Sequence, residues 1–225
     1  VATPLPQILS NLHAAAEAAG RPDPRLLAVS KTQPAEAVAA LAAQGQQAFG
    51  ENYVQEALAK MQALQHLALE WHLIGHLQSN KAEAVATHFD WVQSVDRPKL
   101  VTALARHRPA ARGPLNVLIQ VNIDDESSKH GCAPEDVEGL AAAIAAEPSL
   151  CLRGLMAIPA PWPEAERRRD AFVRMRTLFQ SLAAQRAQVD TLSMGMSSDY
   201  AEAIAEGATL VRIGTALFGA RARPA

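Results

Sequence analysis

One lysine in this sequence stands where its amine could react. Lys31 directly follows an aliphatic run at 26–30, in a chain that contains only five lysines. A lysine at the end of a buried strand can lie in a desolvated cavity, where a neutral amine attacks an aldehyde to form a Schiff base. On spacing alone, a solvated or ion-paired lysine at a strand edge is the more common case.

Two glycine turns late in the chain have the composition of a phosphate site. Gly195 is followed by Ser197 and Ser198, and Gly214 is followed by Thr215. Glycine lets backbone amides approach a ligand closely, and hydroxyls and helix-start amides suit a dianion. Each turn alone could be an ordinary helix cap. Both turns together with a reactive lysine indicate an aldehyde that carries a phosphate, which describes pyridoxal 5'-phosphate.

Arg212 adds a third element, since it precedes Gly214 by two residues. If its side chain points inward, its permanent charge would face the pyridine nitrogen and donate a hydrogen bond to it. The nitrogen would then stay unprotonated and the ring would be a weaker electron sink. A surface arginine is the alternative, and it is more common for this residue type.

A repeated pattern of strands and helices must position these residues. Aliphatic runs predict strands at 26–30, 47–50, 71–75, 91–95, 116–122, 151–157, 191–194 and 209–213. Helical periodicity predicts helices at 34–44, 52–66, 79–88, 97–107, 134–146, 164–187 and 198–205, with a short one from about 215 and a lead-in helix at 5–19.

Eight strand–helix units predict a single (β/α)8 barrel of the TIM type, an α/β fold with an extra N-terminal helix, over residues 1–225. An open doubly wound sheet would more often place a glycine-rich turn after its first strand, where this chain has Ser30-Lys31-Thr32-Gln33. The reactive end of such a barrel is the carboxyl edge of its strands, where Asn52 and His76 also fall.

Composition excludes several classes of function. The chain has 21 basic and 23 acidic residues and a formal net charge of -2, so no basic field for nucleic acid is expected. No apolar segment reaches the length of a membrane span, and no secretory signal pattern opens the chain. We therefore expect a cytoplasmic protein without a membrane or nucleic-acid partner.

Histidines four apart at His72 and His76 raise the question of a metal site. Strand residues at this spacing face the same side, but a zinc site needs a third ligand and the intervening residues supply none. We expect these histidines to line the barrel and predict no bound metal.

Several segments together are similar to one family. They are AVSKT (28–32), FGENYVQE (49–56), WHLIGHLQSNK (71–81), SKHG (128–131), RGLM (153–156), LSMGMS (192–197) and VRIGTALFG (211–219). In this order they resemble the pyridoxal phosphate homeostasis protein family, the YggS/PROSC family, which is related to the N-terminal barrel of alanine racemase. The resemblance runs from about residue 5 to residue 220.

The resemblance implies that one barrel domain holds pyridoxal phosphate as an internal aldimine on Lys31. The residues it implies for cofactor binding are Lys31, Asn52, Met194, Ser197, Ser198, Arg212, Gly214 and Thr215. An acidic residue usually follows the Met-Gly-Met-Ser motif soon, and here Ser198 intervenes before Asp199. Which serine contacts the phosphate is therefore left open.

Members of this family are regarded as carriers or regulators of vitamin B6 and of amino-acid and keto-acid pools, without established turnover. The resemblance therefore implies a monomer that binds pyridoxal phosphate, with apo enzymes that use this cofactor as recipients. The alternative is an amino-acid racemase, which needs a second acid or base on the opposite face of the cofactor. The only tyrosines, Tyr53 and Tyr200, fall at predicted helix starts, and we expect no second, tyrosine-bearing domain.

Overall fold

The computed structural model describes residues 1–127 and 129–220. Ser128 of the SKHG segment and residues 221–225 of the predicted domain lie outside this range. The strands are β1 (Arg25–Val29), β2 (Ala48–Glu51), β3 (Glu70–Leu73), β4 (Trp91–Val95), β5 (Leu115–Gln120), β6 (Leu150–Met156), β7 (Thr191–Ser193) and β8 (Leu210–Ile213). They form a closed barrel in sequence order, and every neighbouring pair is parallel.

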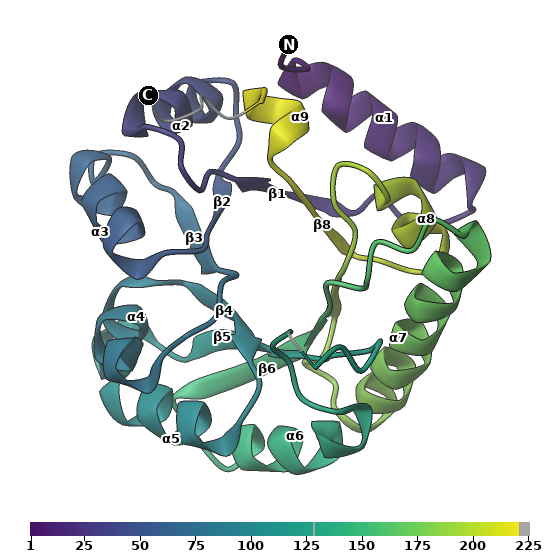
Figure 1. Cartoon of the computed structure of the whole chain (residues 1–225). Helices are drawn as coiled ribbons and strands as arrows, with labels where there is room; N and C mark the ends of the chain where they lie inside the picture. Colours follow the sequence, from purple (N-terminus) through teal and green to yellow (C-terminus); the bar gives the residue numbers. More distant parts are fainter. Residues whose placement is uncertain (128, 221–225) are drawn as a thin grey trace.

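Helices surround the barrel on its outside (Figure 1). They are α1 (Leu5–Ala18), α2 (Ala35–Ala43), α3 (Val54–Ala63), α4 (Ala82–His88), α5 (Pro98–His107), α6 (Val137–Ala145), α7 (Ala165–Gln185), α8 (Tyr200–Ala205) and α9 (Thr215–Phe218). Three short 3-10 helices complete the secondary structure of the described residues: η1 (Ser79–Lys81), η2 (Ala110–Arg112) and η3 (Pro134–Asp136). None of the described helices is long and apolar enough to span a bilayer.

The predicted fold class is confirmed, and the predicted strands agree closely with the observed ones. The clearest differences lie at the ends. The strand predicted at 116–122 ends at Gln120, and the strand predicted at 71–75 ends at Leu73. The predicted helices at 79–88 and 134–146 each begin with a 3-10 turn, and η2 was not predicted. Residues past a strand's last ladder bond keep an aliphatic composition, so composition alone places the ends too late.

The barrel strands are buried on both faces because helices cover the outside and side chains fill the inside. The largest apolar cluster lies between sheet and helices. Leu27 belongs to a separate small cluster with Ala48, Ile74 and Leu210. Side chains two apart on a strand share a face, so Leu27 points to the same side as Val29, which lines a cavity at the barrel mouth.

The lead-in helix α1 follows the predicted spacing of apolar residues. Its buried residues are Leu5, Ile8, Leu12 and Ala16, which recur every three or four positions along one face. The helix ends at Ala18, and Gly20 just beyond it has a left-handed φ of +62°. The Arg21 amide donates back to the Ala16 carbonyl at 2.9 Å. α1 packs beside α8 and α9, the last two helices of the chain (Figure 1).

Candidate functional site

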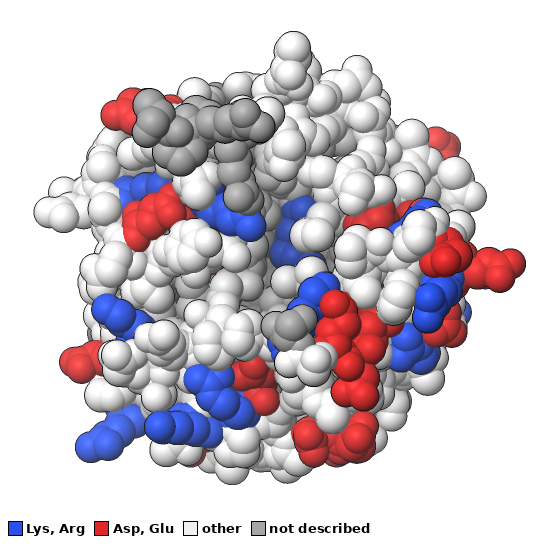
Figure 2. Space-filling view, in the orientation of Figure 1, with Lys and Arg blue, Asp and Glu red and all other residues white. Residues whose placement is uncertain are grey.

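A cavity of about 450 Å³ opens at the carboxyl ends of β1, β7 and β8. Its lining residues are Val29, Lys31, Gln33, Met196, Ser197, Ser198, Arg212, Gly214, Thr215 and Gly219. Six of the eight residues predicted to bind the cofactor are among them. Figure 2 shows basic side chains around the central hollow of this face. Positions far apart in sequence meet here because β8 pairs with β1 and closes the barrel.

The segment that carries Lys31 is anchored on both sides by a buried ionic network. Lys60 of α3 donates from Nζ to the Ser30 carbonyl at 2.6 Å and to Glu51 Oε1, also at 2.6 Å. Its third bond goes to Glu56 Oε1 at 2.8 Å, and Glu56 in turn accepts the backbone amide of Thr32. The backbone before and after Lys31 is therefore tied to one helix.

Local backbone geometry at this segment is unusual. Thr32 has a φ of +64°, a left-handed conformation that a β-branched residue adopts at an energetic cost. The amide of Thr32 bonds to Glu56 in this conformation. Burial raises the pKa of Glu51, while Lys60 and Ser30 oppose that rise by bonding to its charged form. Its second carboxylate oxygen is buried without a hydrogen-bond partner.

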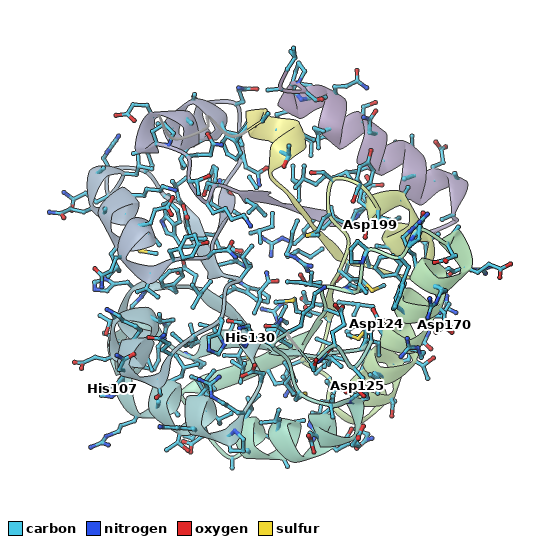
Figure 3. All side chains as sticks on the ribbon, in the orientation of Figure 1. His107, Asp124, Asp125, His130, Asp170 and Asp199 are labelled. Carbon is cyan, nitrogen blue, oxygen red and sulfur yellow. The ribbon has the colours of Figure 1, made fainter. Side chains whose placement is uncertain are left out.

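The two glycine turns bring hydroxyl groups to the cavity. Gly195 has a φ of +96°, and a Cβ there would lie 2.7 Å from the Cβ of Ala203. The turn is held by the Met196 amide, which donates to Asp199 Oδ1 at 2.7 Å at the start of α8 (Figure 3). Gly214 precedes α9, so the first amides of this helix have no intrahelical acceptor. Amides and hydroxyls of both turns are thus available to an anion.

Arg212 points inward, which is the first of the two orientations considered from the sequence, and is only 3% exposed. Its guanidinium donates from Nη1 to Ser193 Oγ at 2.7 Å and from Nη2 to the Ala157 carbonyl at 2.8 Å. Burial lowers its pKa to about 10, so the group remains a cation at neutral pH. No carboxylate among the described residues lies within ion-pair distance of it.

The other two predicted residues do not line this cavity. Asn52 lines a second cavity of about 260 Å³ beside the ends of β2, β3 and β5, and its buried Oδ1 has no hydrogen-bond partner. The Asn52 backbone passes so close to Gly75 that a Cβ there would lie 2.3 Å from its carbonyl oxygen. Met194 is fully buried in the main apolar cluster, and its amide donates to the Leu210 carbonyl at 3.2 Å.

The two histidines considered for a metal lie apart. His72 is fully buried and hydrogen-bonds to Glu70 and Gln93. His76 is exposed and stacks on His130 with ring centroids 3.7 Å apart; Figure 3 labels His130 in the loop after β5.

His76, Asp96 and His130 place their ligand-type atoms within 4.8 Å of one another, although they come from three different loops. Both oxygens of Asp96 already accept bonds, from Arg97 at 2.8 Å and from the Gly131 amide at 3.1 Å. Sequence spacing could not reveal this group, since the loops after β3, β4 and β5 meet only in the folded barrel.

Sequence reasoning also missed the groups that hold the site in place. Lys60 is 5% exposed, although lysine is rarely buried, and its partners are 4 to 30 residues away. Ser193 and Gln93 lie 100 residues apart and share a 2.7 Å hydrogen bond inside the barrel. For Gln93 and Ser193 the available signal was a polar residue within an aliphatic strand, whereas Lys60 lies on α3 and gave no such signal.

The fold and site together define a closed parallel (β/α)8 barrel with a lysine, an arginine and three hydroxyl residues at the carboxyl ends of β1, β7 and β8. A family model described as "Alanine racemase, N-terminal domain" matches residues 4–222.

The chain is 54% identical over 224 residues to the pyridoxal phosphate homeostasis protein of Pseudomonas aeruginosa, covering 98% of this chain and 96% of that one. It is 51% identical over 226 residues to the protein of the same name from Escherichia coli (strain K12), covering 98% and 97%. The chain therefore belongs to the pyridoxal phosphate homeostasis protein family.

Solved structures agree with this assignment. PipY from Synechococcus elongatus PCC7942, solved with PLP bound, has a TM-score of 0.81 at 38% identity and covers 94% of this chain and 100% of its own. Alanine racemase from Corynebacterium glutamicum has a TM-score of 0.69 at 20% identity over 97% of this chain and 62% of its own. This second likeness concerns the fold alone.

Proposed function

We propose that this chain binds pyridoxal 5'-phosphate at the barrel mouth and serves the homeostasis of vitamin B6 and of amino and keto acids. The observation that carries the proposal is the makeup of the cavity. A single lysine shares its lining with an arginine and three hydroxyl residues, and none of the described lining residues carries a carboxylate. This donor set fits an aldehyde that bears a phosphate. Three relatives with this name and one PLP-bound structure support it.

Lys31 would hold the cofactor covalently. A lysine amine can form a Schiff base with an aldehyde, and Lys31 would supply that amine at the barrel mouth. Lys60 and Glu56 keep the backbone on both sides of Lys31 in place. The resulting Schiff base is reversible, which suits storage and release.

The phosphate and the ring would be bound by the other lining residues. Ser197, Ser198 and Thr215 all line the cavity and would hold the phosphate together with the amides at the start of α9. Arg212 would donate to the pyridine nitrogen, because it is buried, cationic and faces the same cavity. Bound pyridoxal phosphate otherwise supplies an electron sink, and a guanidinium at the nitrogen weakens that chemistry.

A carrier without turnover is favoured over a racemase by the acid–base groups present. The described residues that line the cavity include no tyrosine, histidine or carboxylate that could act as a second base. Tyr53 is 59% exposed at the start of α3, and Tyr200 begins α8.

We propose a cytoplasmic monomer that passes its cofactor to apo enzymes.

The absorbance spectrum of the purified protein loaded with pyridoxal phosphate tests this proposal. We expect a visible band that borohydride abolishes, with the reduced adduct mapped to Lys31 by peptide mass spectrometry. Lys31→Ala should lose the band, whereas Lys99→Ala, an exposed lysine of α5, should keep it. A full visible band in Lys31→Ala, or an adduct on another lysine, would contradict the assignment.

A further inference from the structure

Four polar side chains lie inside the barrel, where aliphatic residues usually fill the space. His72, Gln93 and Ser193 are fully buried, and Arg212 is 3% exposed. They come from four strands, β3, β4, β7 and β8. Buried polar groups are costly unless hydrogen-bonded, and these four bond to one another.

The bonds form a continuous chain that starts at the barrel mouth. Arg212 Nη1 lies 2.7 Å from Ser193 Oγ, and Ser193 Oγ lies 2.7 Å from Gln93 Oε1. Gln93 Nε2 lies 2.9 Å from His72 Nδ1. The ring of His72 stacks on Trp91 at a centroid distance of 5.0 Å, which holds its plane.

At the opposite end of the strands the chain reaches surface charges. His72 Nε2 lies 2.6 Å from Glu70 Oε1 at the start of β3. The same oxygen accepts Arg25 Nη2 at 2.9 Å, from the start of β1. The chain therefore crosses the barrel from a buried cation at the mouth to a carboxylate at the other end.

Hydrogen-bonding capacity fixes the direction of every bond. A guanidinium can only donate, so Ser193 Oγ accepts from Arg212 and turns its own proton to the amide oxygen of Gln93. The amide nitrogen of Gln93 then donates to His72, whose Nδ1 must be bare. The proton of the neutral ring sits on Nε2 and is donated to the carboxylate of Glu70.

The charged groups around His72 agree with this assignment. Burial lowers the pKa of His72, while Glu70 and Asp90 oppose that shift and Arg25 adds to it. The bond from His72 contributes most to holding the pKa of Glu70 down, at about 2. At neutral pH the ring is neutral and the carboxylate is charged.

We propose that Gln93 is a positioning residue, which through Ser193 and His72 aims the Arg212 guanidinium at the ring of the bound cofactor. This inference rests on the proposed function. Arg212 is bonded by neutral acceptors, the Ser193 hydroxyl and the Ala157 carbonyl. Among the described residues no carboxylate forms an ion pair with it, and Asp199 acts on its charge only at a longer distance. Its orientation therefore depends on the two neutral acceptors.

The first test needs no cofactor. Long-range ¹H–¹⁵N NMR of the apo protein distinguishes protonated from bare ring nitrogens, and it should show His72 with a proton on Nε2 alone near pH 7. Gln93→Glu replaces the donor that faces Nδ1 with an acceptor, so Nδ1 should gain a proton in that variant. A wild-type His72 with the proton on Nδ1 would overturn the chain.

The second test measures the cofactor. Gln93→Leu should weaken pyridoxal phosphate binding by about tenfold, equivalent to about 1.4 kcal/mol, and should shift the pH response of the visible band. Gln46→Leu is the matched control, since Gln46 is also buried and donates to the carbonyls of Leu26 and Ala48. This control should lose stability while its cofactor affinity and spectrum stay at wild-type values.

The outcomes separate this inference from the proposed function. If wild-type protein binds no pyridoxal phosphate, the proposed function fails, and NMR still decides whether the chain exists. If wild-type protein binds it and Gln93→Leu titrates identically, the positioning role is wrong and the proposed function stands. Should Gln93→Leu not fold, Ser193→Ala, which breaks the chain next to Arg212, takes its place and must show the same loss.

Discussion

At the scale of single residues, Lys60 shows how a buried cation outside the lining of the mouth cavity can shape a site. It is buried and forms ion pairs with Glu51, which is fully inaccessible, and with the half-buried Glu56. Two carboxylates and a backbone carbonyl satisfy its three donors, so the ammonium is fully bonded. The cost of burying these charges is offset only as long as all partners remain.

Lys60→Met should therefore destabilise the protein by about 3 to 5 kcal/mol, because it leaves the Glu51 carboxylate buried without its cation. Urea unfolding at pH 7 measures the change. The double variant Lys60→Met, Glu51→Gln removes both charges and should recover most of the loss. A single variant within about 1 kcal/mol of wild type would show that this network contributes little to stability.

At the scale of elements, one irregularity in the sheet depends on a glycine. The register of β5 and β6 shifts between Val117 and Leu118, and Gly154 of β6 lies opposite this shift with a φ of +152°. A Cβ there would lie 1.8 Å from the Thr191 carbonyl oxygen of β7. The bulge thus lets β6 pack between β5 and β7 at a spacing that only a residue without a side chain at position 154 permits.

Gly154→Ala should cost at least about 2 kcal/mol, since both the backbone conformation and the close approach exclude a Cβ. Gly139→Ala in α6 is the matched control, because nothing lies within 4 Å of the added carbon. It should stabilise the protein by about 0.5 to 1 kcal/mol through helix propensity. Thermal unfolding of both variants makes the comparison, and equal effects would refute the role of the bulge.

At the scale of the whole molecule, the polar chain through the barrel links stability to pH. His72 is buried in its neutral form, and burial lowers its pKa from the ordinary 6.5. Below about pH 6.5 the unfolded chain therefore binds a proton at His72 that the folded protein does not bind. The free energy of unfolding decreases as the pH falls below this value. Glu70 has a pKa of about 2, against an ordinary 4.5, so its contribution is present above 4.5 and is lost towards pH 2.

Urea unfolding from pH 8 to pH 5 should show a free energy of unfolding that stays constant above about pH 6.5. Below that pH it should fall by up to about 1.4 kcal/mol per pH unit. His72→Gln removes the titrating ring and should flatten this slope. If the variant and the wild type decline in parallel, another group causes the acid sensitivity.

The sequence by itself determined the barrel, its extra helix and six of the residues that line the mouth cavity. The spacing of apolar residues that marks strands and helices can be read from short stretches of sequence. The carboxyl ends of all strands of a parallel barrel lie on the same side, at its mouth. Lys31 and the two glycine turns could therefore be placed together from their positions after strands. The resemblance to the family also implied Asn52 and Met194 as cofactor-binding residues, and the described cavity lining includes neither.

Only the tertiary structure decided which side chains pair across the barrel. The Ser193–Gln93 bond spans 100 residues, and the Lys60–Ser30 bond joins a helix to a strand end. His130 meets His76 because two loops converge. A strand pattern shows which face a residue takes, but the stagger of eight strands around a closed barrel sets the height at which it meets a partner. That stagger results from the packing of the whole molecule.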